Sequence, residues 1–227
     1  MRSCPVVLAA VLAAFAACTS VPPFLTGSTS GSNSSSEARP VAAGLKPVRD
    51  YAQEFCGAER PMCLSGAVPD SLRRPLQIPS VSPDAACPVS QANPQIWSRQ
   101  APGLGPGPVG PVGLGTDAVL RYRPASHGNP WGKQKVLWAS SPDYLGPILV
   151  RGGRVDEPGG LGFSVGNGPP LAELQLPPIP AGSPARGSNG WAGWPSYTRV
   201  QAPGCYAYQV DGTDFSYTIV FQAVPLH

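Results

Sequence analysis

The sequence contains few of the residues from which metal sites and nucleic-acid interfaces are built. It has 2 histidines among 227 residues, and neither HExxH nor CxxC occurs, which excludes a three-histidine zinc centre and the common zinc motifs. Charged residues make up 13% of the chain, and the basic ones are scattered, with Arg73-Arg74 as their longest local concentration. A patch that follows a phosphate backbone is therefore not expected. We expect no cofactor and no nucleic-acid partner.

The chain also lacks an apolar stretch long enough to cross a bilayer. The stretch from Val6 to Ala17 would span roughly 18 Å as a helix, against roughly 30 Å of hydrocarbon core. It follows the positive charge of Arg2 and ends in small residues, which is the layout of a signal peptide. We therefore expect residues 1–17 to direct export and to be removed.

The residues at the expected cleavage site are Phe15-Ala16-Ala17-Cys18. They resemble the lipobox of bacterial lipoproteins, in which the cysteine after two small residues is diacylated and becomes the mature N-terminus. Phe15 stands where that pattern usually has Leu. The resemblance implies acyl chains such as palmitate on Cys18 and an extracytoplasmic protein anchored to the membrane by lipid. Ala14-Phe15-Ala16 also suits ordinary signal peptidase, which would leave a secreted protein.

The number of cysteines is consistent with lipidation. The chain has 6 cysteines, of which Cys4 leaves with the signal peptide and Cys18 is consumed by the lipid. The remaining four are Cys56, Cys63, Cys87 and Cys205. Four cysteines can pair completely in an oxidising compartment, and three connectivities are open to them. Four unpaired thiols are the alternative, and ordinary cleavage before Cys18 would leave five cysteines and one reactive thiol.

Composition divides the exported chain into three parts. Residues 18–44 are rich in Ser, Thr, Gly and Pro and offer nothing apolar to bury, so we expect a disordered tether with a reach of roughly 25 to 30 Å. Residues 45–86 are a loop-rich segment with one short amphipathic helix signal between Val48 and Phe55. Residues 87–227 are the expected folded domain. The 27 glycines and 30 prolines of the chain disfavour long helices throughout.

The expected domain begins with a second Gly/Pro stretch, residues 102–115, which we interpret as a loop or extended linker. After it come about seven short apolar runs without a helical period. They cover residues 118–122, 135–139, 148–155, 171–176, 197–201, 205–210 and 215–224. Residues Asp211 to Asp214 separate the last two runs and predict a tight hairpin. The pattern predicts an all-β fold, an antiparallel sandwich that follows the tether and the loop-rich segment.

Short motifs of the domain resemble those of a known group of proteins. They are Cys87-Pro88-Val89-Ser90, Arg151 to Asp156, Trp194-Pro195-Ser196 and Ala202-Pro203-Gly204-Cys205-Tyr206. They are similar to motifs in uncharacterised secreted or lipid-anchored bacterial proteins that have a C-terminal immunoglobulin-like domain with a PGCW turn. In this chain Tyr206 stands where that turn has Trp. The resemblance implies an immunoglobulin-like sandwich and a bridge between Cys87 and Cys205, which leaves Cys56 to pair with Cys63. It implies no activity.

Two strings carry candidate chemistry. Gly162 to Gly166 fits G-x-S-x-G, and a serine hydrolase would use Ser164 with Asp211 or Asp214 and His227. The glycines and prolines after Val165 disfavour the helix which that motif needs. His127 lies in a predicted loop. Asp211 and Asp214 could donate oxygens to calcium, but a hairpin turn uses the same residues for their backbone tolerance, and we expect the turn.

An aromatic group, Trp191, Trp194 and Tyr197, could stack on sugar rings or hold a proline-rich partner, although such groups more often cap a sandwich core. The sequence thus predicts a membrane-tethered lipoprotein with a structural or binding role towards an unknown protein or glycan partner, and no catalysis. The alternatives are a secreted serine hydrolase and a carbohydrate-binding module.

Overall fold

The computed structural model describes residues 69–227, apart from 99–100, 127, 167, 184–185 and 188. The expected signal peptide, tether and short helix, together with Cys18, Cys56, Cys63 and His127, lie outside the described residues. No helix in the described part of the chain is long and apolar enough to span a membrane.

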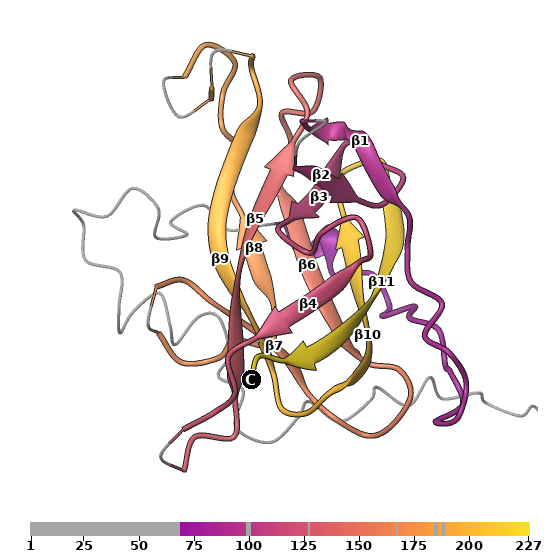
Figure 1. Ribbon diagram of the computed structural model, residues 1–227. Helices are drawn as coiled ribbons and strands as arrows, with labels where there is room; N and C mark the ends of the chain where they lie inside the picture. The colour runs from indigo at the N-terminus through magenta and orange to yellow at the C-terminus, as the bar shows by residue number, and fades with distance from the viewer. Residues whose placement is uncertain (1–68, 99–100, 127, 167, 184–185, 188) are drawn as a thin grey trace, which may run out of the picture. The chain divides into compact units, whose positions relative to one another are not determined.

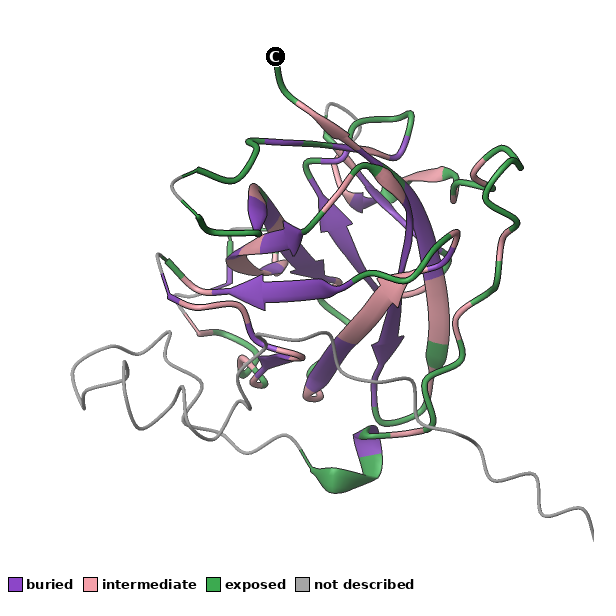
Figure 2. Cartoon of the chain, turned by 90° about the horizontal axis from the view of Figure 1, so that it is seen from below, coloured by how far each residue is buried: buried purple, intermediate pink, exposed green. Residues whose placement is uncertain are grey.

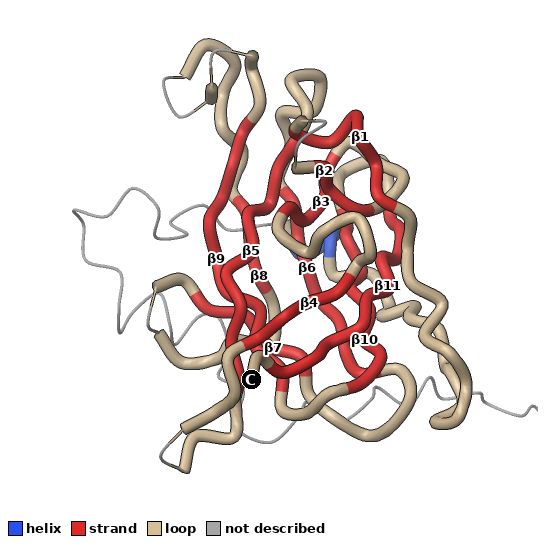
Figure 3. Tube along the Cα trace, viewed as in Figure 1, coloured by secondary structure: helices blue, strands red, loops and turns tan. Residues whose placement is uncertain are grey.

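The described residues form β-strands joined by loops, with one 3-10 turn, η1, at Asp70–Leu72 (Figures 1 and 3). The strands are β1 (Ala92–Trp97), β2 (Pro102–Leu104), β3 (Val109–Val112), β4 (Val119–Tyr122), β5 (Gly132–Ser140), β6 (Ile148–Arg154), β7 (Leu161–Ser164), β8 (Leu174–Leu176), β9 (Ala192–Val200), β10 (Gly204–Asp211) and β11 (Ser216–Pro225). The expected all-β fold is confirmed.

The strands lie in two sheets. Sheet A has 6 strands in the order β1-β2-β3-β5-β9-β7, and sheet B has 5 in the order β4-β11-β10-β6-β8. Sheet B is curled into a half-barrel. Neighbouring strands are antiparallel except β4 and β11, which run parallel from Val119 beside Gln222 to Tyr122 beside Pro225. The expectation of a purely antiparallel arrangement is wrong at this pair, because β4 and β11 are far apart in the chain and are not joined by a hairpin.

One core lies between the sheets, and alternate residues of both sheets point into it. Figure 2 shows the buried residues concentrated on the strands and the exposed ones on the loops. The Tyr208 ring stacks on Phe221 with 4.4 Å between centroids and meets the edge of Trp138 at 5.2 Å. The Tyr208 hydroxyl shares a hydrogen bond of 2.7 Å with Thr198. Burial raises the pKa of Tyr208 well above its usual range, so this phenol stays neutral inside the core.

The predicted hairpin is present between β10 and β11. Its strands pair from Asp211 opposite Ser216 to Gly204 opposite Ala223. The Gly212 N–H donates to the Phe215 carbonyl oxygen at 3.0 Å and closes the turn. Alternation along β11 places Ile219 and Phe221 in the core, as the pattern predicted.

The expected number of strands is wrong. The described residues form eleven strands, and β1 and β7 were not predicted. The interpretation of residues 102–115 as a loop or linker is also wrong, because β2 and β3 lie within this Gly/Pro stretch. A Cβ atom at Gly103 would overlap the Ile96 side chain, and one at Gly110 would overlap the Leu104 carbonyl oxygen. Glycine therefore serves close packing between strands here rather than flexibility.

Residues 73–90, which we call the strap, cross the outer face of sheet B, the face turned away from the core. The strap has no helix or strand, yet it is bound along its length. The Val81 N–H donates to the Val155 carbonyl at 2.8 Å, and the Ser90 N–H donates to the Val220 carbonyl at 2.8 Å. The Thr218 hydroxyl donates to the Gln77 carbonyl at 2.9 Å. The part of the loop-rich segment that the structure describes is thus fixed to the sheet.

Candidate functional site

Ser164, the serine of the G-x-S-x-G string, is the last residue of β7. Leu161 and Phe163 of this strand point into the core, so by alternation Ser164 faces the outer side of sheet A. Its Oγ is buried and has no hydrogen-bond partner in the described part of the chain. The chain continues through a turn at Gly166, whose φ is +62°. In the described residues from 165 to 173 no helix follows, so the strand-to-helix turn of a hydrolase is not formed there.

The predicted partners of Ser164 lie elsewhere. Asp211 ends β10, in which Tyr208 and Val210 point into the core, so Asp211 faces the outer side of sheet B. The core therefore separates Asp211 from Ser164. Asp214 is exposed in the hairpin turn, and His227 is exposed beyond β11. The structure does not bring these residues together as a catalytic triad.

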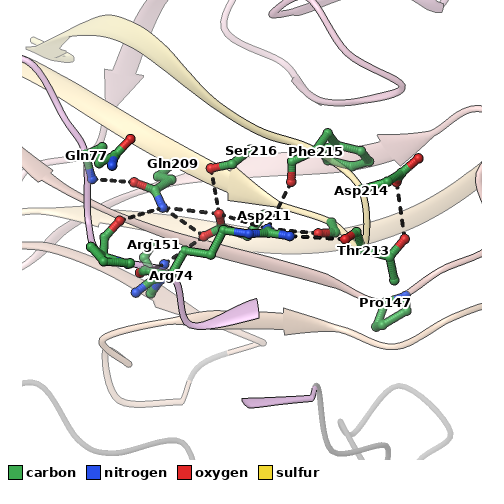
Figure 4. Close-up of polar contacts among 12 residues, drawn as sticks. Arg74, Gln77, Pro147, Arg151, Gln209, Asp211, Thr213, Asp214, Phe215 and Ser216 are labelled. Carbon is green, nitrogen blue, oxygen red and sulfur yellow. Dashed lines mark hydrogen bonds and ion pairs between the residues drawn. The ribbon is translucent and has the colours of Figure 1, made fainter. Parts of the chain in front are cut away.

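Asp211 is the centre of a polar network at the end of the strap (Figure 4). Its carboxylate is fully buried and accepts hydrogen bonds of 2.7 Å from Arg151 Nη2 and 2.7 Å from Ser216 Oγ. Gln209 Nε2 donates to it at 3.0 Å. From the strap, Arg74 Nη1 lies 3.4 Å from Asp211 Oδ1. A buried carboxylate that lies between two guanidinium groups and accepts several hydrogen bonds is compensated.

Arg74 also binds the backbone of the hairpin. It donates to the carbonyl oxygens of Gly212 at 2.9 Å, Phe215 at 3.0 Å and Thr213 at 3.1 Å. Arg151 Nη2 in turn donates to the Arg74 carbonyl at 2.6 Å. These contacts leave little of the network free for a ligand. Their effect is to fix the strap to the β10–β11 hairpin.

The disulfide between Cys87 and Cys205 fixes the other end of the strap. The two Cα atoms are 5.5 Å apart, and the cysteines are separated by 118 positions in the sequence. This is the pair that the resemblance implied. The half-buried Cys87 packs against Cys205, Val155, Ala207 and Val220 in a small cluster on the outer face of sheet B. The strap is therefore held by ionic contacts at one end and by a covalent bond at the other.

The predicted aromatic group does not form one surface. Trp194 lies opposite Trp138 and packs against the core. Trp191 packs on the outer side of sheet A against Trp97, with ring centroids 6.4 Å apart and planes at 80°. Tyr197 also faces outward, and Lys133 Nζ lies 5.4 Å from its ring centroid, a cation–π contact. All three predicted residues are half-buried.

An open pocket of about 430 Å³ lies between Ser80 of the strap and residues 154–159, which are the last residue of β6 and the loop after it. Arg154 Nε donates to Asp156 at 2.7 Å, and Arg154 Nη2 lies 2.8 Å from Glu157. Burial acts to raise the pKa of Asp156, but hydrogen bonds from Arg154 and from the Cys205 N–H outweigh it and lower the pKa. Arg154 thus pairs with both carboxylates of this pocket, and the three groups together carry one net negative charge.

A set of basic residues on the outer face of sheet A was missed by the sequence analysis. Arg199 is 7% exposed, and its Nε has no hydrogen-bond partner in the described part of the chain. Burial lowers the pKa of this guanidinium, with Tyr197 acting in the opposite direction. The only signal in the sequence is the alternation of Lys133 with Lys135 and of Tyr197 with Arg199. This alternation does not show that the basic residues lie side by side until the register between β5 and β9 is known.

Among the described residues no group of His, Cys, Asp and Glu side chains is placed to hold a metal ion. Asp211 and Asp214 belong to the hairpin instead, Asp211 in the network above and Asp214 as acceptor of a 3.2 Å hydrogen bond from Thr213. Comparison of the chain with models of protein families, with curated proteins and with solved structures finds no match. The function has to be inferred from the residues and their geometry.

Proposed function

We propose that this chain is an extracytoplasmic bacterial lipoprotein, anchored to the membrane by acyl chains on Cys18, whose folded part has a structural or binding role without catalysis. The observation that carries the proposal is the Cys87–Cys205 bridge. Disulfides persist in oxidising compartments and are rare in the cytosol. The signal-peptide layout of residues 1–17 and the lipobox-like Phe15 to Cys18 support the same extracytoplasmic location.

The absence of catalysis is supported by the position of the candidate residues. Ser164 and Asp211 face opposite sides of the molecule, and Asp211 is engaged by Arg74 and Arg151. A nucleophile needs its base within hydrogen-bond reach. A rigid scaffold with a strap fixed at both ends suits a module that presents a surface rather than one that rearranges around a substrate.

We also keep the immunoglobulin-like fold as a proposal. It is supported by the Tyr206 hydroxyl, which donates to the Ala202 carbonyl at 2.8 Å. This contact is similar to the tyrosine corner of immunoglobulin-like sandwiches, although Tyr206 directly follows Cys205 whereas the tyrosine of that motif stands two residues before the second cysteine. The parallel pairing of β4 with β11 departs from that pattern, and an experimental structure compared with known sandwiches is the test.

The anchor is tested by cell fractionation of the chain with Cys18→Ser. If Cys18 carries the lipid, the variant moves from the membrane fraction to the periplasm or the medium, because no other apolar segment holds it. The matched control is Cys63→Ser, which leaves the anchor intact and is expected to stay with the membrane. A Cys18→Ser protein that remains in the membrane fraction would contradict the proposal.

The hydrolase alternative is tested with a fluorophosphonate probe, which labels activated serines. We expect no labelling of the native chain, because no base among the described residues lies within hydrogen-bond reach of the Ser164 Oγ. Stoichiometric labelling that disappears in Ser164→Ala but persists in Ser196→Ala would overturn the non-catalytic role.

A further inference from the structure

Like charges stand side by side on the outer face of sheet A. Lys133 pairs with Arg199 across β5 and β9. Arg123 pairs with Lys133 through two backbone hydrogen bonds of 2.9 and 3.0 Å. Residues paired in this way point to the same side of the sheet, and like charges directly opposite each other are destabilising. We call Arg123, Lys133 and Arg199 the cationic row.

A second row lies beside the first on the same face. Lys135 pairs with Tyr197, and Tyr197 pairs with Ser164 of β7. Both rows alternate with residues of the core such as Val136 and Thr198, so their side chains share the outer side. The face therefore combines cationic groups, a phenol and a hydroxyl, and every one of them can donate a hydrogen bond.

No acid of the surrounding segments balances these charges. Residues 124–142, 158–172 and 191–203 contain neither Asp nor Glu. Elsewhere in the described residues Arg73, Arg74, Arg121, Arg151 and Arg154 all have carboxylate partners. Arg199 has none among the described residues, although it is the most buried of the cationic row.

Two donors without a partner lie on this face, one on the edge strand β7 and one on the adjacent β9. The Nε of Arg199 and the Oγ of Ser164 are both buried, and neither has a hydrogen-bond partner in the described residues. They belong to neighbouring positions, since Gly162 stands opposite Arg199 and Ser164 opposite Tyr197. Buried donors of this kind are rare in native proteins and indicate a missing acceptor. A negatively charged acceptor would satisfy both donors and separate the like charges.

We propose that the outer face of sheet A binds a phosphate or sulfate group, free or carried as an ester by a small molecule, with Arg199 as its main ligand, Lys133 and Lys135 beside it on β5, and Arg123 beyond Lys133 at the other end of the cationic row. Arginine forms paired hydrogen bonds to such oxyanions. Adjacent strands are about 4.8 Å apart, so the cationic row extends over about 10 Å, enough for one oxyanion and its flanking charges. Tyr197, with Lys133 over its ring, lies where the ester group would rest. The inference is independent of the anchor on Cys18.

The test is calorimetric titration of the purified full chain carrying Cys18→Ser, at low ionic strength, with inorganic phosphate, inorganic sulfate and phenyl phosphate. We expect saturable binding with a Kd of about 1 mM or tighter. Arg199→Gln is expected to weaken binding at least about tenfold, since it removes the charge-assisted bonds. The exposed Lys135→Gln tests the same face if Arg199→Gln does not fold. Arg73→Gln, on the strap, is the matched control and is expected to leave the affinity unchanged.

The arms of the experiment separate the outcomes. If phenyl phosphate binds more tightly than inorganic phosphate, the ligand is an ester. If the two bind equally, the ligand is the free ion. Lys133→Gln should raise the melting temperature without anion, because it relieves repulsion, and lower it relative to the native chain with saturating phosphate. Failure of all three anions to bind at about 10 mM would refute the proposal. Binding that appears only after Glu37, Asp50, Glu54 and Glu59 are changed to amides would also refute it, since a carboxylate of the chain would then be the acceptor.

Discussion

Removal of the Cys87–Cys205 bridge is expected to destabilise the domain strongly. The change is Cys87→Ala together with Cys205→Ala. The bridge closes a loop in which the cysteines are 118 positions apart, and this loop contains most of the strands. In the chain-entropy model a loop of this length restricts the unfolded state by about 5 kcal/mol. Typical domains have a total stability of about 5 to 15 kcal/mol, so the bridge is a large part of the margin.

The structure indicates that added freedom in the folded state offsets little of this destabilisation. The strap remains bound through Arg74 and Ser90, so Cys87 and Cys205 stay close together in the variant and the folded domain gains almost no freedom. In a domain of this size each kcal/mol shifts the melting temperature by about 2 to 4 °C. We therefore expect a decrease of about 10 to 20 °C.

The assay is thermal and urea unfolding followed by circular dichroism, with Cys56→Ala and Cys63→Ala as the control double variant. The control is expected to lose much less, because Cys56 and Cys63 could close only a short loop. The urea dependence should also become steeper in the Cys87/Cys205 variant, since its unfolded state exposes more surface. A decrease below about 3 °C, or a non-reduced peptide map that joins Cys63 to Cys205, would refute the reasoning.

Two further predictions concern carboxylates on the outer face of sheet B. Asp211→Asn is expected to lower the free energy of unfolding by about 3 kcal/mol, since it leaves the guanidinium groups of Arg74 and Arg151 without their buried charged partner. The measurement is urea unfolding, and a change of less than about 1 kcal/mol would contradict this role. The pKa of Asp156 is lowered in the folded state, so its stabilisation is present above the unfolded pKa of about 4 and is lost as the pH falls through the folded value. Acid unfolding of Asp156→Asn should therefore depend less on pH below about pH 4 than that of the native chain, and parallel curves would show that Asp156 contributes nothing.

The sequence predicts those parts of the fold that depend on local pattern. The alternation along β11 and the Asp211-Gly212 turn specify a hairpin without help from the rest of the chain. Prediction from the sequence fails for β2 and β3. A Gly/Pro composition is typical of a linker, and only the structure shows that Ile96 packs on Gly103. Prediction also fails for the strap, whose residues adopt no regular element and are ordered only by sheet B.

The candidate sites were less predictable than the strands. Trp194 and Tyr197 are three positions apart, and only the strand β9 shows that one faces the core and the other faces outward. The cationic row requires the pairing of Arg123 with Lys133 and of Lys133 with Arg199. The second of these pairings joins residues 66 positions apart, and a pairing at that separation leaves no periodic trace in a single sequence.

The position of β11 has a consequence for the order in which the molecule assembles. This strand lies between β4 and β10 in sheet B, and it binds the strap through Gln77 and Ser90, at sequence separations of 141 and 130 residues. A chain that emerges from the ribosome or from a translocation channel cannot complete sheet B until residues 216–225 are free. Topologies dominated by such distant pairings fold slowly. The two thiols of the bridge therefore meet late, and oxidation should record the completion of folding rather than guide its start.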